Sequence, residues 1–274
     1  MSTPYIIYAV FAFLLGAVVG SFLNVCICRL PHGESVVSPP SHCPKCDYRI
    51  RWYDNIPILS YLLLKGKCRS CGAPISVQYP MVELLNGLLA LALFCKFFPA
   101  GFLEVAPPGA MLMPAFFFAI LFVFCSALVT ITFIDLEHQI IPDVITLPGI
   151  VLGFILSFFI PQLGWLNSLI GIVGGGGSLL LIAWLYQVVA KKDGMGGGDV
   201  KLLAMMGAFL GWKAIIFIVF VSSLLGSVIG VTLMVIRKKD STLAIPFGPF
   251  LASAAVLYIF YGRRIIHWYL TLGS

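Results

Sequence analysis

The stretch Lys191-Lys192-Asp193-Gly194-Met195-Gly196-Gly197-Gly198-Asp199-Val200-Lys201 joins two apolar runs, and Asp199 leads directly into the second of them. A carboxylate that enters an apolar helix is costly unless it has a function or a partner. Glycine carries no Cβ and tolerates positive φ, so these glycines allow the backbone to approach another group closely. The stretch therefore indicates a functional acidic residue at the end of an apolar helix.

A second stretch has the same character. It is Phe133-Ile134-Asp135-Leu136-Glu137-His138-Gln139-Ile140-Ile141-Pro142-Asp143, which follows a long apolar run and leads into the next one. Proline is well tolerated in the first turn of a helix, so a new helix is expected to begin near Pro142. We predict that Asp135 and Asp199 face each other at one membrane surface and act as a pair.

The composition indicates a membrane protein. The chain has 274 residues, of which 60% are hydrophobic and 10% are charged. Its apolar blocks have the length of about 20 residues that a helix needs to cross about 30 Å of hydrocarbon. We therefore predict an all-α polytopic protein in contact with lipid, with one polar insert. The net charge of +6 is typical of cytoplasmic loops, and the lack of a basic patch interleaved with aromatic residues argues against nucleic acid as a partner.

The apolar blocks predict about eight transmembrane helices, with seven as the alternative because residues 200–211 are short for a crossing. The N-terminal block has no basic region before it and no convincing cleavage site, so it is interpreted as a retained span. Residues 199–237 are expected to form a hairpin of two spans. The other expected spans cover about residues 5–28, 79–98, 115–134, 142–160, 168–190 and 245–261.

The charges predict an orientation. The polar segment 29–78 carries seven Lys or Arg residues against three acidic residues, which favours the cytoplasm and leaves the N-terminus periplasmic. Lys191 and Lys192 indicate the cytoplasm again, so Asp135 and Asp199 fall on the same side.

Small residues at Gly16 and Gly20 favour close helix contact. The four glycines at 174–177 indicate either tight packing or a local break in the helix.

Two C-x-x-C pairs lie in the polar segment. Cys43-Pro44-Lys45-Cys46 and Cys68-Arg69-Ser70-Cys71 are separated by 21 residues. Two such turns can complete a closed tetrahedral site, which predicts a structural Zn²⁺ held by four thiolates. The alternatives are four unrelated surface cysteines or a redox pair. His42 is surplus to a four-cysteine site and is expected to be solvated.

The remaining acidic residues are assigned simpler roles. Glu137 and Asp143 are interpreted as interfacial residues, with Asp143 near the positive end of a helix dipole. Two neighbouring carboxylates such as Asp135 and Asp199 hold one proton between them, so that one acts as base and the other as acid toward a water that attacks a peptide carbonyl. Six acidic residues are expected to be solvated in loops: Glu34, Asp47, Asp54, Glu104, Asp193 and Asp240.

In this order the motifs resemble the bacterial type IV prepilin peptidases, also called prepilin leader peptidase/N-methyltransferases, of the GxGD type. The likeness covers nearly the whole chain. It rests on Gly20-Ser21-Phe22-Leu23-Asn24-Val25, Arg29-Leu30-Pro31, both C-x-x-C pairs, Trp52-Tyr53-Asp54-Asn55-Ile56-Pro57-Ile58-Leu59-Ser60-Tyr61, Gln78-Tyr79-Pro80-Met81-Val82-Glu83-Leu84, the segment 135–143 and Gly196-Gly197-Gly198-Asp199-Val200-Lys201.

The resemblance implies a bifunctional enzyme of the bacterial inner membrane. Such an enzyme cleaves prepilin and pseudopilin leaders after a glycine at the cytoplasmic face. It then N-methylates the new terminal residue, usually Phe, from S-adenosylmethionine. The family's catalytic aspartates map onto Asp135 and Asp199. The methyl-donor region is expected near the cytoplasmic loop and the segment from Glu83 to Gly87.

The resulting domain scheme has a first span (1–28), a zinc-binding loop associated with methyl transfer (29–78) and a transmembrane aspartic peptidase domain (79–274). Two rival interpretations remain. A proton- or ion-coupled transporter would use the aspartates as a relay and predicts carboxylates near mid-span. A non-enzymatic assembly factor with a zinc-stabilised docking loop predicts that Asp199→Asn leaves function intact.

Overall fold

The computed structural model describes residues 3–190, 196–237 and 246–271, so Lys191 to Met195 and Asp240 lie outside the described residues. The described chain is helical, and its β-structure is limited to isolated bridges in the polar loop. This confirms the all-α class. The chain divides into two compact units, Met1–Thr130 and Ile131–Ser274.

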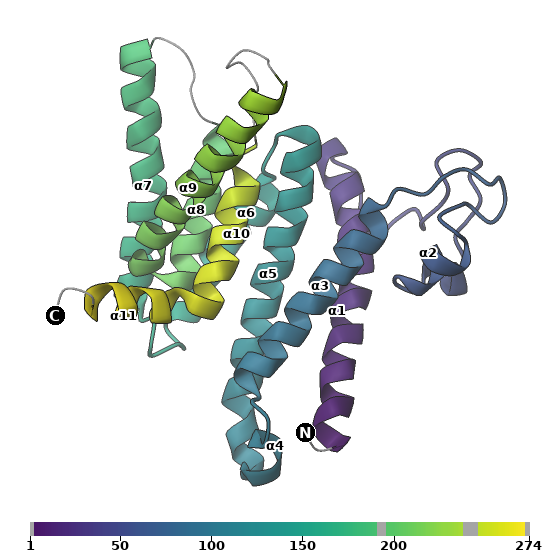
Figure 1. The fold of residues 1–274 in the computed structure, drawn as a ribbon, viewed down its shortest axis with the longest axis horizontal. Helices are drawn as coiled ribbons and strands as arrows, with labels where there is room; N and C mark the ends of the chain where they lie inside the picture. Colours follow the sequence, from purple (N-terminus) through teal and green to yellow (C-terminus); the bar gives the residue numbers. More distant parts are fainter. Residues whose placement is uncertain (1–2, 191–195, 238–245, 272–274) are drawn as a thin grey trace. The chain divides into compact units, whose positions relative to one another are not determined.

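The first unit is built on two long helices that lie side by side (Figure 1). A Cβ on Gly16 would lie 2.7 Å from the backbone oxygen of Asn86, and one on Gly20 would lie 2.7 Å from Cα of Glu83. The close helix contact expected at these glycines is therefore confirmed. The elements are α1 (Thr3–Arg29), η1 (Leu30–His32), η2 (Trp52–Asn55), α2 (Leu59–Leu63), α3 (Gln78–Phe97), α4 (Phe102–Val105), η3 (Pro108–Met111) and the first part of α5 (Leu112–His138).

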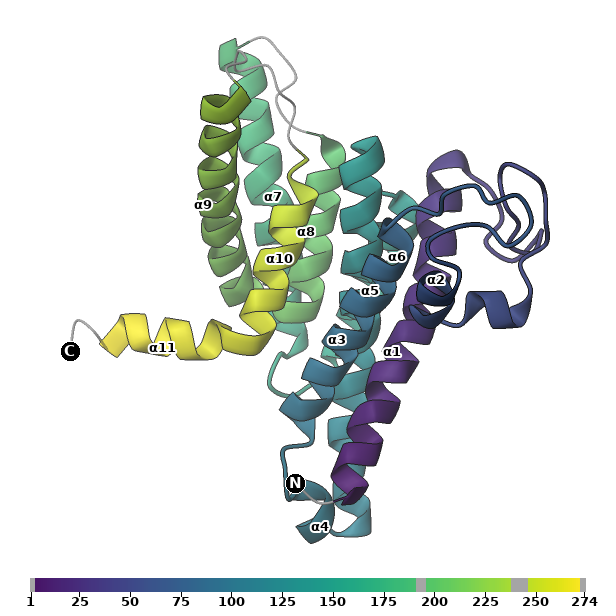
Figure 2. The same cartoon turned by 45° about the vertical axis from the view of Figure 1, so that its right-hand side comes forward.

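The second unit surrounds one short helix, α8. Its residues from Leu202 to Ala208 are all buried, and it packs against α6, α7, α9 and α10 (Figure 2). The elements are the end of α5, α6 (Asp143–Ser157), α7 (Trp165–Ala190), α8 (Gly197–Leu210), α9 (Trp212–Arg237), α10 (Gly248–Leu257), the π turn η4 (Tyr258–Gly262) and α11 (Arg263–Thr271).

The described helices lie at the positions where the eight spans are expected. Five of them, α1, α3, α5, α7 and α9, are long and apolar enough to cross a membrane. Three shorter helices, α6, α8 and α10, lie where the other spans are expected. The expected hairpin is present, because α8 and α9 are joined at Gly211, whose φ of +80° allows the tight turn. The chain is therefore a multi-pass helical membrane protein.

The glycine run in α7 serves packing and does not break the helix, since α7 is continuous through it. A Cβ on Gly175 would lie 2.7 Å from the backbone oxygen of Leu203 in α8. Nothing described lies within 4 Å of the position that a Cβ would take on the neighbouring Gly174. Two adjacent glycines thus have opposite surroundings.

Gly175→Ala is therefore expected to destabilise the protein, because the new methyl group pushes α7 away from α8. Overpacking of this kind costs about 1–3 kcal/mol. Gly174→Ala is the matched control, since it adds only the helix propensity of alanine, about 1 kcal/mol of stabilisation. Thermal unfolding in detergent, followed by tryptophan fluorescence, compares the two. Equal midpoints for both variants would contradict this packing.

Candidate active site and metal-binding loop

Asp135 is a buried carboxylate near the end of α5, with 5% of its surface exposed. The preceding residues Ile131 and Ile134 are fully buried, so the helix directs this face into the second unit. The backbone N–H of Gly248 donates a hydrogen bond of 2.9 Å to Oδ2 of Asp135. Because Gly248 begins α10, the carboxylate lies at the positive end of that helix, which stabilises negative charge.

Asp199 lies in the first turn of α8, after the glycine run. A Cβ on Gly198 would lie 2.8 Å from Cβ of Ile141, which belongs to the connection between α5 and α6. Glycine at this position therefore lets the start of α8 lie against that connection. The carboxyl groups of Asp199 and Asp135 are close enough to repel each other when both are charged.

Three helix N-termini in the second unit carry a carboxylate. Asp143 lies in the first turn of α6, Asp199 in the first turn of α8, and Asp135 at the start of α10. The starts of α6, α8 and α10 lie at one end of this unit, the end at which α5 finishes (Figures 1 and 2). The partial positive charges of three helix ends therefore favour anions at this end of the unit.

The residues around the aspartates have identifiable local roles. Asp143 accepts hydrogen bonds of 2.7 and 2.8 Å from Nζ of Lys201, which links the first turns of α6 and α8. Both side chains are partly exposed, so this ion pair contributes little stability. Glu137 is exposed, in agreement with an interfacial residue.

Four cysteines of the first unit form a cluster that could hold a metal ion. The Sγ atoms of Cys43, Cys46, Cys68 and Cys71 all lie within 4.8 Å of one another. Sγ of Cys43 is 3.9 Å from that of Cys71, and Sγ of Cys46 is 4.0 Å from that of Cys68. A regular tetrahedron with Zn–S bonds of about 2.3 Å has sulfur–sulfur distances of about 3.8 Å, so the cluster fits zinc. The alternative of four unrelated surface cysteines is wrong.

The two C-x-x-C turns have the same local structure. In each, the residue after the second cysteine has a positive φ: 54° at Asp47 and 69° at Gly72. In each, that residue donates its N–H to the carbonyl of the first cysteine. The backbone N–H groups of Cys71 and Ser70 lower the pKa of the Cys68 thiol to about 7, which favours the thiolate that binds metal. His42 is exposed, as expected.

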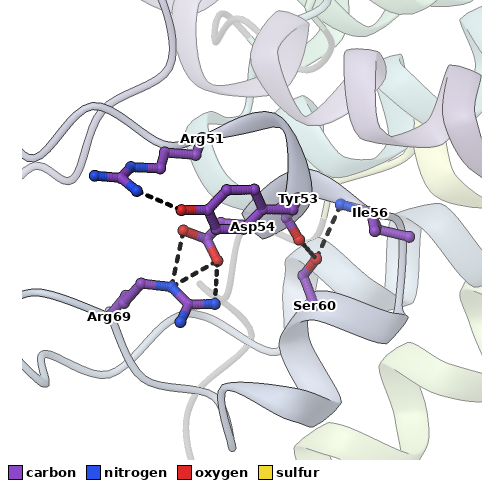
Figure 3. A network of polar contacts seen from close by, with 6 residues as sticks. All are labelled: Arg51, Tyr53, Asp54, Ile56, Ser60 and Arg69. Atoms are coloured by element: carbon purple, nitrogen blue, oxygen red, sulfur yellow. Dashed lines mark hydrogen bonds and ion pairs between the residues drawn. The ribbon is translucent and has the colours of Figure 1, made fainter.

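A polar network ties the second C-x-x-C turn to η2 (Figure 3). Nε of Arg69 donates to both carboxylate oxygens of Asp54 at 2.8 and 3.0 Å, and Nη2 donates to Oδ1 at 2.6 Å. The side chain of Asp54 is only 4% exposed, so the expectation of a solvated residue was wrong. The guanidinium groups of Arg69 and Arg51 lie 5.4 and 5.8 Å from the centre of the Tyr53 ring.

Comparison with known proteins identifies the family. The model of the Bacterial Peptidase A24 N-terminal domain matches residues 14–97, and that of the Type IV leader peptidase family matches residues 122–231. A protein of Pseudomonas aeruginosa named prepilin leader peptidase/N-methyltransferase is 38% identical, over 95% of this chain and 93% of its own length. The chain belongs to the prepilin leader peptidase/N-methyltransferase family. It is therefore an enzyme.

Two further relatives carry the same name. That of Aeromonas hydrophila is 37% identical over 97% of this chain and 94% of its own length. That of Myxococcus xanthus is 40% identical over 83% of this chain, which spans 64% of the relative's length. No solved structure matches the chain. The cysteine cluster lies within the N-terminal family match, and both aspartates lie within the leader peptidase match.

The expected methyl-donor residues of this leader peptidase occupy packed positions in α3. Oε2 of the buried Glu83 accepts a hydrogen bond of 2.7 Å from the N–H of Ile58, whose φ is +63°. Such a φ is strained for a β-branched residue, so Glu83 supports an unusual loop conformation. A Cβ on Gly87 would lie 2.9 Å from the ring of Phe13 in α1. The segment therefore joins the loop to the α1–α3 pair.

Sequence reasoning missed Gly248. It lies 113 residues after Asp135 and outside the leader peptidase match, yet it donates a hydrogen bond to that carboxylate. A Cβ on Gly248 would lie 2.6 Å from Oδ2 of Asp135. The only local signal is its position between two Pro-Phe pairs, in Ile245-Pro246-Phe247-Gly248-Pro249-Phe250.

If Asp135 takes part in leader cleavage, Gly248→Ala is expected to reduce cleavage by about 100-fold, since displacing a reacting group by about 1 Å has effects of this size. The methyl group would push Asp135 away from the N–H that holds it. Gly226→Ala is the matched control, because its Cβ would make ordinary contacts, the nearest at 3.6 Å from Phe250. Initial rates on one prepilin substrate compare the variants. Full activity of Gly248→Ala would show that this contact does not orient Asp135.

Proposed function

We propose that this chain removes the leader of type IV prepilins and pseudopilins and then methylates the new N-terminus. The proposal rests on membership of the leader peptidase family and on one observation in particular. Asp135 near the end of α5 and Asp199 in the first turn of α8 are far apart in the sequence, yet their carboxyl groups interact electrostatically. Neither of the rival interpretations receives support from the comparisons, and neither aspartate lies near the middle of its helix.

In the proposed peptidase reaction the two carboxyl groups share one proton. The N–H of Gly248 and the start of α10 stabilise negative charge on Asp135, so Asp135 acts as the base and Asp199 holds the proton. Asp135 removes a proton from a water molecule, whose oxygen attacks the scissile carbonyl carbon. Asp199 donates its proton to the leaving amide nitrogen. The C–N bond then breaks, and no covalent enzyme intermediate forms.

The proposed site receives its substrate at the inner-membrane surface that faces the cytoplasm. A prepilin would place its apolar helix in the bilayer and its basic leader outside, with the scissile bond at the depth of the aspartates. The pair carries net negative charge, which attracts a basic leader. Positive charges of the polar loop support its location in the cytoplasm and that of the N-terminus in the periplasm.

We propose that methyl transfer depends on the loop of residues 29–78. When bound, S-adenosylmethionine would supply an electrophilic methyl group to the neutral amine of the new N-terminus. The four cysteines would hold a structural Zn²⁺ that stabilises the loop, and Glu83 and Gly87 connect the loop to α1 and α3. Residues 79–274 form the proposed aspartic peptidase domain in the membrane. Residues 1–28 form the first span.

The decisive experiment follows both reactions on one substrate. Purified protein in detergent is incubated with a prepilin whose basic leader ends in glycine before Phe, with and without S-adenosylmethionine. Mass spectrometry is expected to show the free leader in both reactions. An added methyl group on the mature chain is expected only with the methyl donor. A substrate whose glycine is replaced by valine is the control and should stay intact. Failure of the unmodified protein to cleave would overturn the proposal.

A further inference from the structure

The C-terminal helix α11 is amphipathic and differs from the other helices of its unit. Tyr261, Ile265 and Trp268 recur at spacings of four and three residues, so they lie on one helical face. Trp268 is 62% exposed and Tyr261 is 54% exposed, which is unusual for two large aromatic side chains in water. The basic residues Arg264 and His267 lie three residues apart along one edge of that face. An apolar face left open next to a basic face is typical of helices that lie in a membrane interface.

The direction of α11 supports such a location. Figures 1 and 2 both show α11 running across the direction of α10. The chain bends at the π turn η4, where the ring of Tyr258 covers Gly262 so closely that a Cβ there would overlap it. A π turn next to glycine is a common cause of a sharp bend. If α10 crosses the bilayer, α11 therefore runs along its surface.

The side of the membrane follows from contacts within the second unit. The ring of Tyr258 lies 5.5 Å from that of Phe217, in the early part of α9. The start of α9 follows directly after the end of α8, whereas Asp199 lies at the start of α8. The helix α11 therefore belongs to the end of the unit opposite Asp135 and Asp199.

Charge indicates what α11 binds. Residues 241–274 contain Arg263 and Arg264 and no acidic residue. Under the proposed orientation these arginines lie outside, against the usual distribution of basic residues. Arg264 also borders a hollow of about 280 Å³ that is otherwise lined by Tyr261, Ile265 and Trp268. A cation beside an apolar hollow matches a molecule with an anionic head and an apolar body.

We propose that α11 is an interfacial anchor that binds anionic phospholipids in the leaflet opposite the aspartates. Tyr261, Ile265 and Trp268 enter the boundary between headgroups and acyl chains, where tryptophan and tyrosine are enriched. Arg264, which borders the hollow, pairs with lipid phosphates, which have the geometry that guanidinium groups bind well. The anchor would hold the bend after α10 at a defined depth. This inference requires only the membrane location and not the proposed catalytic activity.

The test places Trp268 relative to lipid in the full-length protein. The protein is reconstituted in bilayers that contain either phosphatidylglycerol or phosphatidylcholine with brominated acyl chains. Fluorescence of Trp268 is obtained as the difference between the unmodified protein and Trp268→Phe. We expect brominated phosphatidylglycerol to quench Trp268 about two- to fivefold more efficiently than brominated phosphatidylcholine, because each basic residue near an anionic surface adds binding of about this size. Bromine near the headgroup should quench more than bromine deep in the chain.

The arginines are tested with Arg263→Gln combined with Arg264→Gln. In this variant, Trp268 should be quenched equally by brominated phosphatidylglycerol and brominated phosphatidylcholine. Arg49→Gln combined with Lys65→Gln is the control, because it removes the same charge from the polar loop. Quenching of Trp268 in this control should still be stronger with phosphatidylglycerol than with phosphatidylcholine. Quenching of Trp268 by neither lipid would overturn the proposal and would point to a protein partner or to water. Equal quenching by both lipids in the unmodified protein would overturn the binding of anionic headgroups.

Discussion

Asp199→Asn is expected to reduce leader cleavage by about 10³-fold or more, and Asp135→Asn is expected to do the same. Asparagine keeps the size and shape of aspartate but can neither remove a proton from water nor donate one to a leaving amine. Acid–base catalysis by one group contributes about 10²- to 10⁴-fold. The carbonyl oxygen of an asparagine at position 135 can still accept the hydrogen bond from Gly248, so the local fold should survive.

The double variant separates a catalytic pair from two independent residues. If the aspartates act as one unit, removing both should cost about as much as removing either. Single-turnover cleavage of a prepilin substrate measures the rates. Glu137→Gln is the matched control, because Glu137 is an exposed acidic residue in the same segment as Asp135. Methylation of a substrate that has already lost its leader should be normal in all four variants. Substantial cleavage by either single aspartate variant would mean that the pair is misassigned.

Cys43→Ser combined with Cys46→Ser is expected to abolish metal binding and, with it, methyl transfer. The loop has almost no apolar core, since Cys43 is the only buried apolar residue within residues 29–78. Structural zinc binding contributes about 10–16 kcal/mol in small peptides, and that free energy becomes folding free energy when the apo site is unfolded. Loss of half the ligands should therefore unfold the loop.

Three measurements check this prediction. Elemental analysis should find one zinc per unmodified chain and almost none in the double variant. Limited proteolysis should cut the variant within residues 29–78. Methylation of a substrate that lacks its leader should be lost, while leader cleavage persists in part. Cys95→Ser is the control, because Cys95 is an exposed cysteine in α3 outside the cluster. A double variant without zinc that methylates normally would sever the link between the metal and methyl transfer.

Features that depend on local patterns can be predicted from the amino-acid sequence alone. Apolar blocks of membrane-spanning length predict the helices, because a helix in lipid must satisfy its own backbone groups. The C-x-x-C pairs predict the metal cluster, because each pair forms its own tight turn. Only the approach of the two turns to each other then depends on the rest of the fold. The choice of Asp135 and Asp199 followed from carboxylates at the ends of apolar runs, where an unpaired charge is costly.

Features that depend on contacts between residues distant in the sequence become visible only in the folded structure. Whether the glycines of α7 pack or break the helix depends on what lies opposite, and Gly175 meets Leu203 while Gly174 meets nothing described. The side chain of Asp54 is shielded from solvent and paired with Arg69, 15 residues away in the loop. The contact between Gly248 and Asp135 spans 113 residues. No local pattern encodes these pairings, since burial and hydrogen bonding between separate helices arise only when the helices pack together.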